Sequence, residues 1–255
     1  MERAIPKQIH FCWFGGNPKS EIIEKCIESW KALLPDYELI EWNESNFDIH
    51  ACKYVEEAYE RKKWAFVSDY CRIWALHTHG GVYFDTDVEV IRDPGGIFDT
   101  PCVGFESERA VNPGLVMACA KDDWLCAQML REYNEDSFIL PDGSNNYRTI
   151  CDRMTFFLSE KGLRLDNTLQ TVAGYTVYPT EYFNPYNSKK DRFEVTKNTV
   201  TLHRFLASWQ SDDSFILTKD TNLNGRIFIL LVKLFGLKNA KKIRQFLKHP
   251  FRKSK

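Results

Sequence analysis

The sequence predicts an α/β fold with a mostly parallel central sheet flanked by helices. In the first half of the chain, apolar stretches typical of buried strands alternate with amphipathic stretches of helical length, which favours a layered α/β domain. One apolar stretch, residues 82–84, runs directly into two carboxylates, Asp85 and Asp87. The composition, with 44% hydrophobic and 27% charged residues over 255 positions, is that of an ordinary globular protein.

The expected elements follow from hydrophobic periodicity and from Gly and Pro positions. Strands are predicted at 9–15, 37–42, 82–84, 102–107, 114–119, 171–179 and 199–205. Helices are predicted after Gly15-Gly16, at 53–63, 64–79, 122–134, 147–161 and within 222–249. Asn17 is the expected N-cap of the first helix, because Pro18 suits the first helical position.

The charge distribution divides the chain into two predicted parts. Ten of the 34 Lys and Arg residues lie in 225–255, which contains no Asp or Glu, so residues 1–224 carry 24 basic and 35 acidic side chains. We therefore expect an acidic globular domain over 1–224 and a basic amphipathic helical tail over 225–255. The net charge of −1 argues against a nucleic-acid partner.

Cysteine spacing and hydropathy indicate the cellular compartment in which the protein is expected. The eight cysteines include no Cys-x-x-Cys pair, and their spacing fits free thiols in a reducing compartment. The N-terminus lacks a secretory apolar segment, and the most apolar window, 227–237, is about half the length of a membrane span. We expect a cytoplasmic protein, and the basic residues 238–255 offer a contact with an anionic inner membrane surface.

Asp85 and Asp87 carry the first chemical signal. Side chains one residue apart in an extended backbone point to the same side, and two adjacent carboxylates repel each other unless a cation lies between them. A divalent cation with oxygen ligands satisfies this arrangement. Because the pair follows an apolar strand, it is expected at the carboxyl edge of the sheet, where α/β folds bind ligands.

Asp69 and Arg72 carry the second signal. The predicted helix 64–79 is apolar nearly all round, and these two charged side chains share one of its faces at i and i+3. Buried charges are costly unless they are paired. Two interpretations stay open: an internal salt bridge, or a pair that faces the aspartate site and binds the hydroxyl groups of a ligand.

Three ordered segments carry a resemblance. These are "IPKQIHFCWFGG" at 5–16, "FVSDYCRIWALHTHGGVYFDTDVEVI" at 66–91 and "TLHRFLASW" at 201–209. Together they resemble the DXD-containing sugar transferases of glycosyltransferase family 32, which include capsular polysaccharide transferases and α-mannosyltransferases. The resemblance implies a GT-A-type nucleotide-sugar-binding fold, a nucleotide-sugar co-substrate, Mn²⁺ or Mg²⁺, and retention of anomeric configuration.

The resemblance also implies residue roles. The expected metal ligands are Asp85, Asp87 and His203. The residues expected to contact the nucleotide-sugar are Trp13, Tyr83, Asp85, Ser208 and Trp209. The residues expected at the reacting sugar are Asp69, Arg72, Asp85 and Asn112. Each of three residues has an alternative interpretation. Trp13 can be a core aromatic, and His203 can be a structural strand histidine. Asn112, which precedes Pro-Gly, can be a turn residue.

The function so implied is transfer of a hexose, from a UDP-sugar in our prediction, to a glycan or lipid-linked glycan, as in capsular or surface polysaccharide synthesis. Two alternatives come from other classes. A haloacid-dehalogenase-like phosphohydrolase would use Asp85 as its nucleophile, since an apolar strand followed by Asp-x-Asp also resembles that motif. A catalytically inactive sugar-nucleotide-binding protein would bind the donor without turnover.

Overall fold

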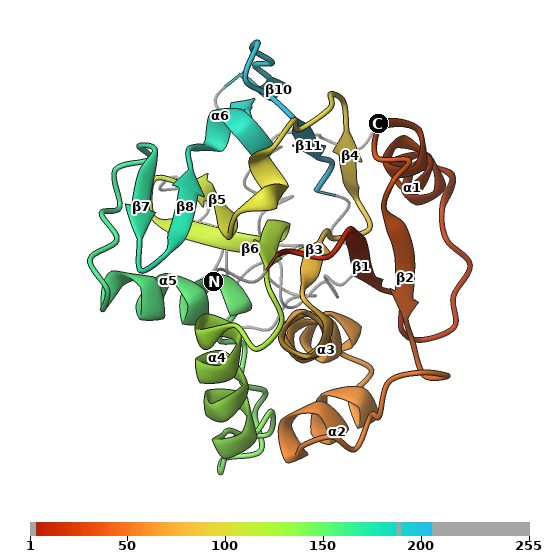
Figure 1. Cartoon of the computed structure of the whole chain (residues 1–255). Coiled ribbons are helices and arrows are strands. Elements are labelled where there is room, and N and C mark those ends of the chain that lie inside the picture. Colours follow the sequence, from red (N-terminus) through yellow and green to blue (C-terminus); the bar gives the residue numbers. More distant parts are fainter. Residues whose placement is uncertain (1–3, 188–189, 206–255) are drawn as a thin grey trace, which may run out of the picture. The chain divides into compact units, whose positions relative to one another are not determined.

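A computed structural model of the protein describes residues 4–187 and 190–205 (Figure 1). The helices are α1 (Glu21–Leu33), α2 (Lys53–Glu60), α3 (Trp64–His79), α4 (Trp124–Glu135), α5 (Ile150–Ser159) and α6 (Thr180–Phe183), with a 3-10 turn, η1 (Ile97–Asp99). The strands are β1 (Gln8–Cys12), β2 (Glu38–Trp42), β3 (Gly81–Tyr83), β4 (Val88–Val90), β5 (Cys102–Ser107), β6 (Ala110–Cys119), β7 (Gln170–Val172), β8 (Tyr175–Tyr178), β9 (Tyr186–Asn187), β10 (Arg192–Phe193) and β11 (Thr201–His203).

The central sheet has seven strands in the order β2-β1-β3-β6-β5-β8-β7. Strands β1, β2, β3, β5 and β8 run in one direction, while β6 and β7 run in the other. The predicted α/β fold with a mostly parallel sheet flanked by helices is therefore confirmed. The carboxyl ends of β1, β2, β3 and β5 meet at one edge, together with the start of β6.

Alternating side chains build a separate core on each face of the sheet. Ile9, Val82 and Phe84 pack on the face covered by Trp30 of α1 and Phe183 of α6. The intervening side chains, such as Cys12 and Tyr83, pack on the opposite face. Helices α3, α4 and α5 belong to that second face, below the sheet in the view of Figure 1. This period of two is the pattern expected of strands buried on both sides.

Helix α3 and strand β3 are joined by a single residue, Gly80. The helix ends at Gly80, whose φ is +73°, and the strand begins at Gly81, whose φ is +106°. A Cβ atom at Gly81 would lie 2.7 Å from the carbonyl oxygen of Gln8 on the neighbouring strand. Both positions therefore need glycine, for conformation and for space, and they fix the direction in which β3 carries Asp85 and Asp87.

A two-stranded sheet brings a late segment of the chain to this region. Strand β11 pairs antiparallel with β4, so that His203 lies opposite Val88. The backbone N–H of Arg204 donates to the carbonyl of Asp87 at 2.9 Å. Residues 91–200 lie between these two strands in the sequence. Their pairing places β11 directly beside the aspartates.

Two local predictions were wrong. The first helix begins at Glu21 with Ser20 as its N-cap, so Asn17 and Pro18 belong to the preceding loop. The expected single strand at 171–179 is a hairpin of β7 and β8, because Ala173 and Gly174 adopt positive φ and reverse the chain. In the first case Pro18 lies in the loop and not at the first helical position, and in the second the Ala173-Gly174 turn divides the apolar run.

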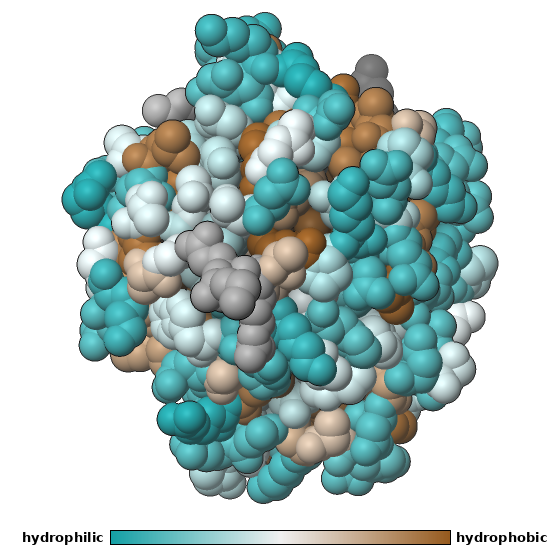
Figure 2. Space-filling view, in the orientation of Figure 1, coloured by the Kyte–Doolittle hydropathy of each residue, from teal (hydrophilic) through white to brown (hydrophobic). Residues whose placement is uncertain are grey.

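The predicted basic tail at 225–255, its membrane-facing part at 238–255 and residues Ser208 and Trp209 all lie outside the described residues. The boundary at residue 224 therefore stays a prediction. Within the described part of the chain, no helix has the length and apolar character needed to cross a membrane. The face in Figure 2 is mainly hydrophilic, with smaller hydrophobic areas between polar side chains.

Candidate active site

Asp85 and Asp87 occupy a tight turn that follows β3. The backbone N–H of Asp85 donates to the carbonyl of Gly114 at 2.8 Å, and the N–H of Val88 donates to the carbonyl of Asp85 at 3.0 Å. Both aspartates are half-buried, whereas the preceding Phe84 is fully buried. The turn thus presents the two carboxylates at the carboxyl edge of the sheet, as the sequence predicts.

Arg72 joins two carboxylates from different elements. Its Nη2 atom lies 3.0 Å from Asp69 Oδ1 and 3.1 Å from Asp85 Oδ1. The side chains of Arg72 and Asp69 are only 6% and 10% exposed. The two readings left open by the sequence are therefore compatible: the pair on α3 is an internal salt bridge, and the same bridge extends to the aspartate turn.

Burial sets the electrostatics of this cluster. It raises the pKa of Asp69 to about 6, although Arg72 and the N–H of Ile150, at the start of α5, favour the charged carboxylate. Burial alone would lower the pKa of Arg72, but Asp85, Tyr83 and Asp69 raise it well above its usual value. Arg72 is therefore a permanent cation, and the two carboxylates depend on it.

Tyr83 contacts both Asp85 and Arg72. It is 1% exposed, its hydroxyl donates to Asp85 Oδ1 at 3.3 Å, and the Arg72 guanidinium lies 4.7 Å from its ring centroid. In this structure Tyr83 orients Asp85 and Arg72, while its expected contact with a nucleotide-sugar stays a prediction. The cation–π contact with Arg72 and the hydrogen bond to Asp85 together hold these two charged groups in one arrangement.

His203 completes the aspartate site. Its Nε2 atom is 3.0 Å from Asp87 Oδ1, and its Nδ1 atom is buried without a hydrogen-bond partner. Burial disfavours the imidazolium, but the carboxylates of Asp87, Asp85 and Glu106 raise the pKa of His203 above its usual value. A histidine drawn to carboxylates in this way can exchange its proton for a metal ion.

The geometry of Asp85, Asp87 and His203 fits a divalent cation. Their ligand atoms all lie within 4.8 Å of one another. Two ligands bound at right angles about 2.1 Å from an octahedral ion are about 3 Å apart, which matches the 3.0 Å between His203 Nε2 and Asp87 Oδ1. Two carboxylates and one imidazole are a donor set that first-row divalent ions accept.

Strand β6 leaves the regular ladder to reach the same site. Its pairing with β5 shifts abruptly, from Val103 opposite Met117 to Gly104 opposite Asn112. The residues between form an excursion in which the Asn112 side-chain oxygen accepts from the N–H of Gly114 at 2.6 Å. Asn112 is 6% exposed, and the excursion places it next to the aspartate turn.

Gly114 is required by this close approach. A Cβ atom there would lie 1.9 Å from Asp85 Oδ2 and 2.7 Å from Arg72 Nη1. Replacing Gly114 with Ala is therefore expected to lower the free energy of unfolding by about 1–3 kcal/mol through overpacking. It should also displace Asp85, so donor turnover should fall as well.

Denaturant unfolding measures the first effect, and Gly96→Ala is the matched control. Gly96 has a φ of −87°, and a Cβ atom there would come within 4 Å only of the Asp99 carboxyl. A Gly114→Ala protein as stable and active as the control would contradict the packing described here.

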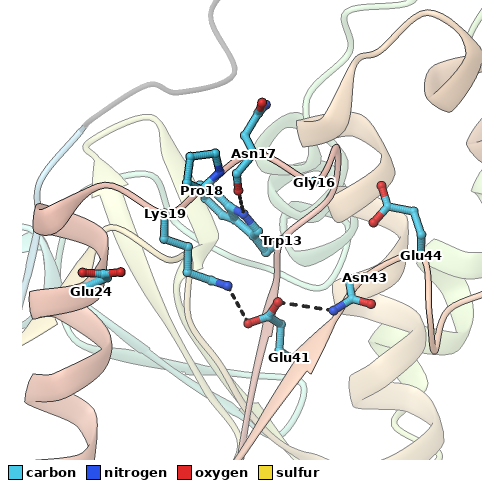
Figure 3. Close-up of a pocket in the computed structure, with 9 residues that line it drawn as sticks. All are labelled: Trp13, Gly16, Asn17, Pro18, Lys19, Glu24, Glu41, Asn43 and Glu44. Atoms are coloured by element: carbon cyan, nitrogen blue, oxygen red, sulfur yellow. Dashed lines mark hydrogen bonds and ion pairs between the residues drawn. The ribbon is translucent and has the colours of Figure 1, made fainter.

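A pocket lies at the same sheet edge, at the ends of β1 and β2 (Figure 3). It has a volume of about 410 Å³. Trp13 lies within it and donates its indole N–H to the carbonyl of Asn17 at 2.6 Å. Lys19 reaches from the loop to pair with Glu41 at 2.7 Å. The pocket is lined by Trp13, Gly16, Asn17, Pro18, Lys19, Glu24, Glu41, Asn43 and Glu44.

The register of the sheet relates this pocket to the aspartates. His10 of β1 lies opposite Tyr83 of β3, so Trp13 and Asp85 both follow the carboxyl ends of neighbouring parallel strands. Trp13 is half-buried at a pocket, not enclosed in the core, which leaves its ring accessible for the nucleotide-sugar contact that the resemblance implies.

Glu106 is the residue near the site that sequence reasoning missed. It lies at the end of β5, and its carboxyl interacts with Asn112 and Cys151 and feels the charges of His203 and Asp85. Burial raises its pKa above the usual value. A charged residue directly after the apolar run 102–105 is the signal that would have identified it.

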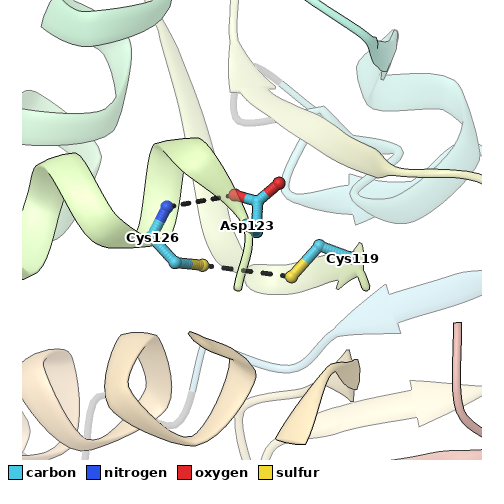
Figure 4. Close-up of side chains that lie close together, drawn as sticks. All are labelled: Cys119, Asp123 and Cys126. Carbon is cyan, nitrogen blue, oxygen red and sulfur yellow. Dashed lines mark hydrogen bonds between the residues drawn. The ribbon is translucent and has the colours of Figure 1, made fainter. Parts of the chain in front are cut away.

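A second group of potential ligands lies elsewhere (Figure 4). Cys119 Sγ and Cys126 Sγ are 3.9 Å apart, and Asp123 lies beside them. Cys119 is opposite Gly81, at the start of β3, so this group is at the sheet edge away from Asp85. Asp123 already caps α4 by accepting from Leu125 and Cys126 N–H groups, and helix capping together with core packing accounts for the arrangement.

One protein family matches part of the chain. Residues 20–103 match the family described as the glycosyltransferase sugar-binding region containing the DXD motif. The matched stretch contains Asp69, Arg72, Asp85 and Asp87. The match supports sugar transfer for this chain, and it contains the aspartates on which the metal prediction depends. No curated protein sequence matches the chain.

Three of the solved structures to which the chain is similar are glycosyltransferases. "PaToxG Glycosyltransferase" is 18% identical, with a TM-score of 0.48 over 63% of this chain and 71% of that one. A glycosyltransferase involved in glycosylation of the major capsid of PBCV-1 is 15% identical, with a TM-score of 0.45 over 79% and 94%. The galactosyltransferase LgtC, in complex with donor and acceptor sugar analogs, is 15% identical, with a TM-score of 0.41 over 77% and 86%.

Proposed function

We propose that the protein is a metal-dependent, retaining glycosyltransferase of the family 32 type that transfers a hexose from a UDP-sugar. The observation that carries the proposal is the joint placement of two groups at one sheet edge. Asp85, Asp87 and His203 form a cation-binding set, and Asp69 and Arg72 lie directly beside it through Asp85. The family match over residues 20–103 supports sugar transfer.

Two groups of residues would have separate roles in the reaction. A divalent ion, Mn²⁺ or Mg²⁺, held by Asp85, Asp87 and His203 would neutralise the charge that develops on the diphosphate as the sugar–phosphate bond breaks. Asp69 and Arg72 would bind sugar hydroxyls and hold the anomeric carbon toward the acceptor. Because Arg72 and Tyr83 fix Asp85 before substrate binds, the site needs little rearrangement to stabilise the transition state.

The acceptor and the location belong to the same proposal. We expect a glycan or a lipid-linked glycan, as in capsular or surface polysaccharide synthesis. A cytoplasmic enzyme that meets lipid-linked acceptors benefits from the basic residues 238–255, since each Lys or Arg near anionic lipid contributes roughly 1 kcal/mol. The prediction applies to that segment of sequence alone.

Donor turnover tests the proposal directly. Purified protein is incubated with UDP- and GDP-hexoses, with and without Mn²⁺, and release of the nucleoside diphosphate is measured. We expect turnover with a UDP-hexose that EDTA removes and Mn²⁺ restores. Turnover of GDP-sugars alone would exclude the UDP assignment, and absence of turnover and of donor binding would exclude the enzyme.

Trp13→Ala is expected to raise the donor KM by roughly tenfold to hundredfold, because loss of one stacked base costs about 1–3 kcal/mol. Trp13→Phe is the matched variant, since it keeps an aromatic face for the base and should retain most of the affinity. Initial rates at varied donor concentration measure the KM, and calorimetric titration measures the donor affinity. An unchanged donor KM in Trp13→Ala would mean that this tryptophan packs against the fold and does not bind the donor.

An α-linked donor is expected to give an α-linked product. The coupling constant of the anomeric proton in the NMR spectrum of the product decides this point. A β-linked product would exclude the retaining reaction while leaving sugar transfer in place.

The two alternatives make different predictions. A phosphohydrolase would form an aspartyl phosphate on Asp85, yet this carboxylate already accepts contacts from Arg72 and Tyr83. An inactive binding protein would bind UDP-sugar without releasing the diphosphate. Mass spectrometry of the protein after turnover distinguishes the first, and the donor assay distinguishes the second.

A further inference from the structure

The side chain of Glu106 is directed by a β-bulge. Phe105 pairs with Val111 and Ser107 pairs with Ala110, so Glu106 has no partner across the β5–β6 ladder. An extra residue in one strand turns its side chain out of the regular alternation, and such bulges often occur beside active sites. The ladder is therefore interrupted at the point where β5 reaches the carboxyl edge of the sheet.

The bulge is held in place from a second element. The side-chain amide of Asn184, which follows α6, donates to the carbonyl oxygen of Glu106 at 3.1 Å. Asn184 is 4% exposed, so this bond is shielded from water. A buried polar side chain that satisfies an otherwise unpaired carbonyl makes the bulge a fixed feature of the fold.

The Glu106 carboxyl faces a polar group whose orientation is known. The Asn112 side-chain oxygen accepts from the backbone N–H of Gly114 at 2.6 Å, which assigns the amide and leaves its NH₂ group for other partners. Asn112 lies opposite Gly104 on β5, two residues before Glu106, and its amide favours the charged form of the Glu106 carboxyl, whose pKa burial raises. The Gly114 N–H therefore holds the amide oxygen, and the amide nitrogen is the end available to the Glu106 carboxyl.

We propose that Glu106 is a positioning residue that fixes the side-chain NH₂ group of Asn112 toward the reacting sugar. This inference rests on the proposed sugar transfer for its catalytic consequence. The bulge aims the carboxylate, the Gly114 N–H fixes the amide oxygen, and the carboxylate then restrains the amide nitrogen. One N–H remains free to donate to a donor hydroxyl or to the oxygen that accumulates charge.

Such a role predicts a defect in turnover and not in donor affinity. Misplacement of a catalytic group by about 1 Å can cost 100-fold in rate. Glu106→Ala should therefore lower kcat by roughly tenfold to hundredfold and leave the donor KM within about threefold. Glu106→Gln should recover most of kcat, because its side-chain carbonyl still accepts from the Asn112 NH₂ group.

A double-mutant cycle tests whether Glu106 acts through Asn112. We expect Glu106→Ala to cause no further loss of kcat in an Asn112→Ala background, since residues that act as a unit are not additive. Glu108→Gln is the matched control, because Glu108 is exposed in the turn of the same hairpin, and it should behave as wild type. Multiplicative losses in the double variant, or a Glu106→Gln protein as slow as Glu106→Ala, would overturn the proposal.

A second measurement does not depend on turnover. In wild-type protein the Asn112 side-chain amide signals, assigned with Asn112→Ala, should shift in the ¹H–¹⁵N spectrum as Glu106 titrates, and this shift should be lost in Glu106→Gln. Asn112 signals that titrate identically in the two proteins would exclude the contact. If wild type turns over no donor, the proposed function fails, while this titration still decides whether Glu106 positions Asn112.

Discussion

Asp87→Asn is expected to abolish donor turnover, by about 10³-fold or more, while the protein remains folded. Asp87 supplies one of two carboxylates to the cation-binding set, and its Oδ1 atom is 3.0 Å from His203 Nε2. Asparagine has the same shape but no charge, so the side chain still fits the turn after β3. A site that neutralises a departing diphosphate loses its main electrostatic contribution when the cation is no longer held.

The measurement has three parts. Steady-state release of the nucleoside diphosphate gives the rate, calorimetric titration with Mn²⁺ gives the metal affinity, and thermal unfolding verifies the fold. Glu89→Gln is the matched control, because it removes the same charge from the neighbouring strand β4 and breaks only a surface pair with Arg204. Wild-type turnover in Asp87→Asn, or turnover of wild type that resists EDTA, would exclude the metal assignment.

Local patterns were sufficient for the part of the site that follows α3 and β3. The helix was predicted at 64–79 and is found at Trp64–His79, because its apolar run ends at two glycines. The position of Asp85 and Asp87 followed from the apolar strand before them. In these segments short-range periodicity and the sheet edge determine where each side chain points.

Other parts depend on contacts between distant segments. A strand was predicted at 114–119, whereas β6 spans Ala110–Cys119 and contains an excursion that brings Gly114 into contact with Asp85. The bulge at Glu106 depends on Asn184, which is 78 residues away. His203 entered through a resemblance, since nothing in its local spacing predicts that β11 pairs with β4.

Arg72→Met is expected to lower the free energy of unfolding by about 3–5 kcal/mol, because removing one partner of a buried ion pair leaves an uncompensated charge. Methionine fills a similar volume, so the loss reflects mainly electrostatics. Asp69, 10% exposed in its side chain, would retain the more distant charge of Arg153 and the Ile150 N–H as favourable influences. The same substitution removes a contact that orients Asp85, so donor turnover should also be lost.

The pH dependence identifies the cause. Asp69 has a folded-state pKa raised to about 6 by burial, while Arg72 holds it below the value that burial alone would give. Without Arg72 this pKa rises further, so above about pH 6 the folded variant binds more protons than folded wild type does. Stability then falls with pH in the variant relative to wild type, and the deficit should be small at pH 5.5 and large at pH 8.

Urea unfolding at these two pH values, in EDTA, measures the deficit. The double variant Asp69→Asn/Arg72→Met is the decisive companion, because it removes the unpaired carboxylate together with its cation. Replacing a whole buried pair is often nearly neutral, whereas breaking it is costly, so the double variant should be more stable than Arg72→Met at pH 8 and show less pH dependence. A deficit independent of pH, or one that Asp69→Asn does not reduce, would mean that Arg72 stabilises the fold by packing against Tyr83 and not by holding two carboxylates at the edge of the sheet.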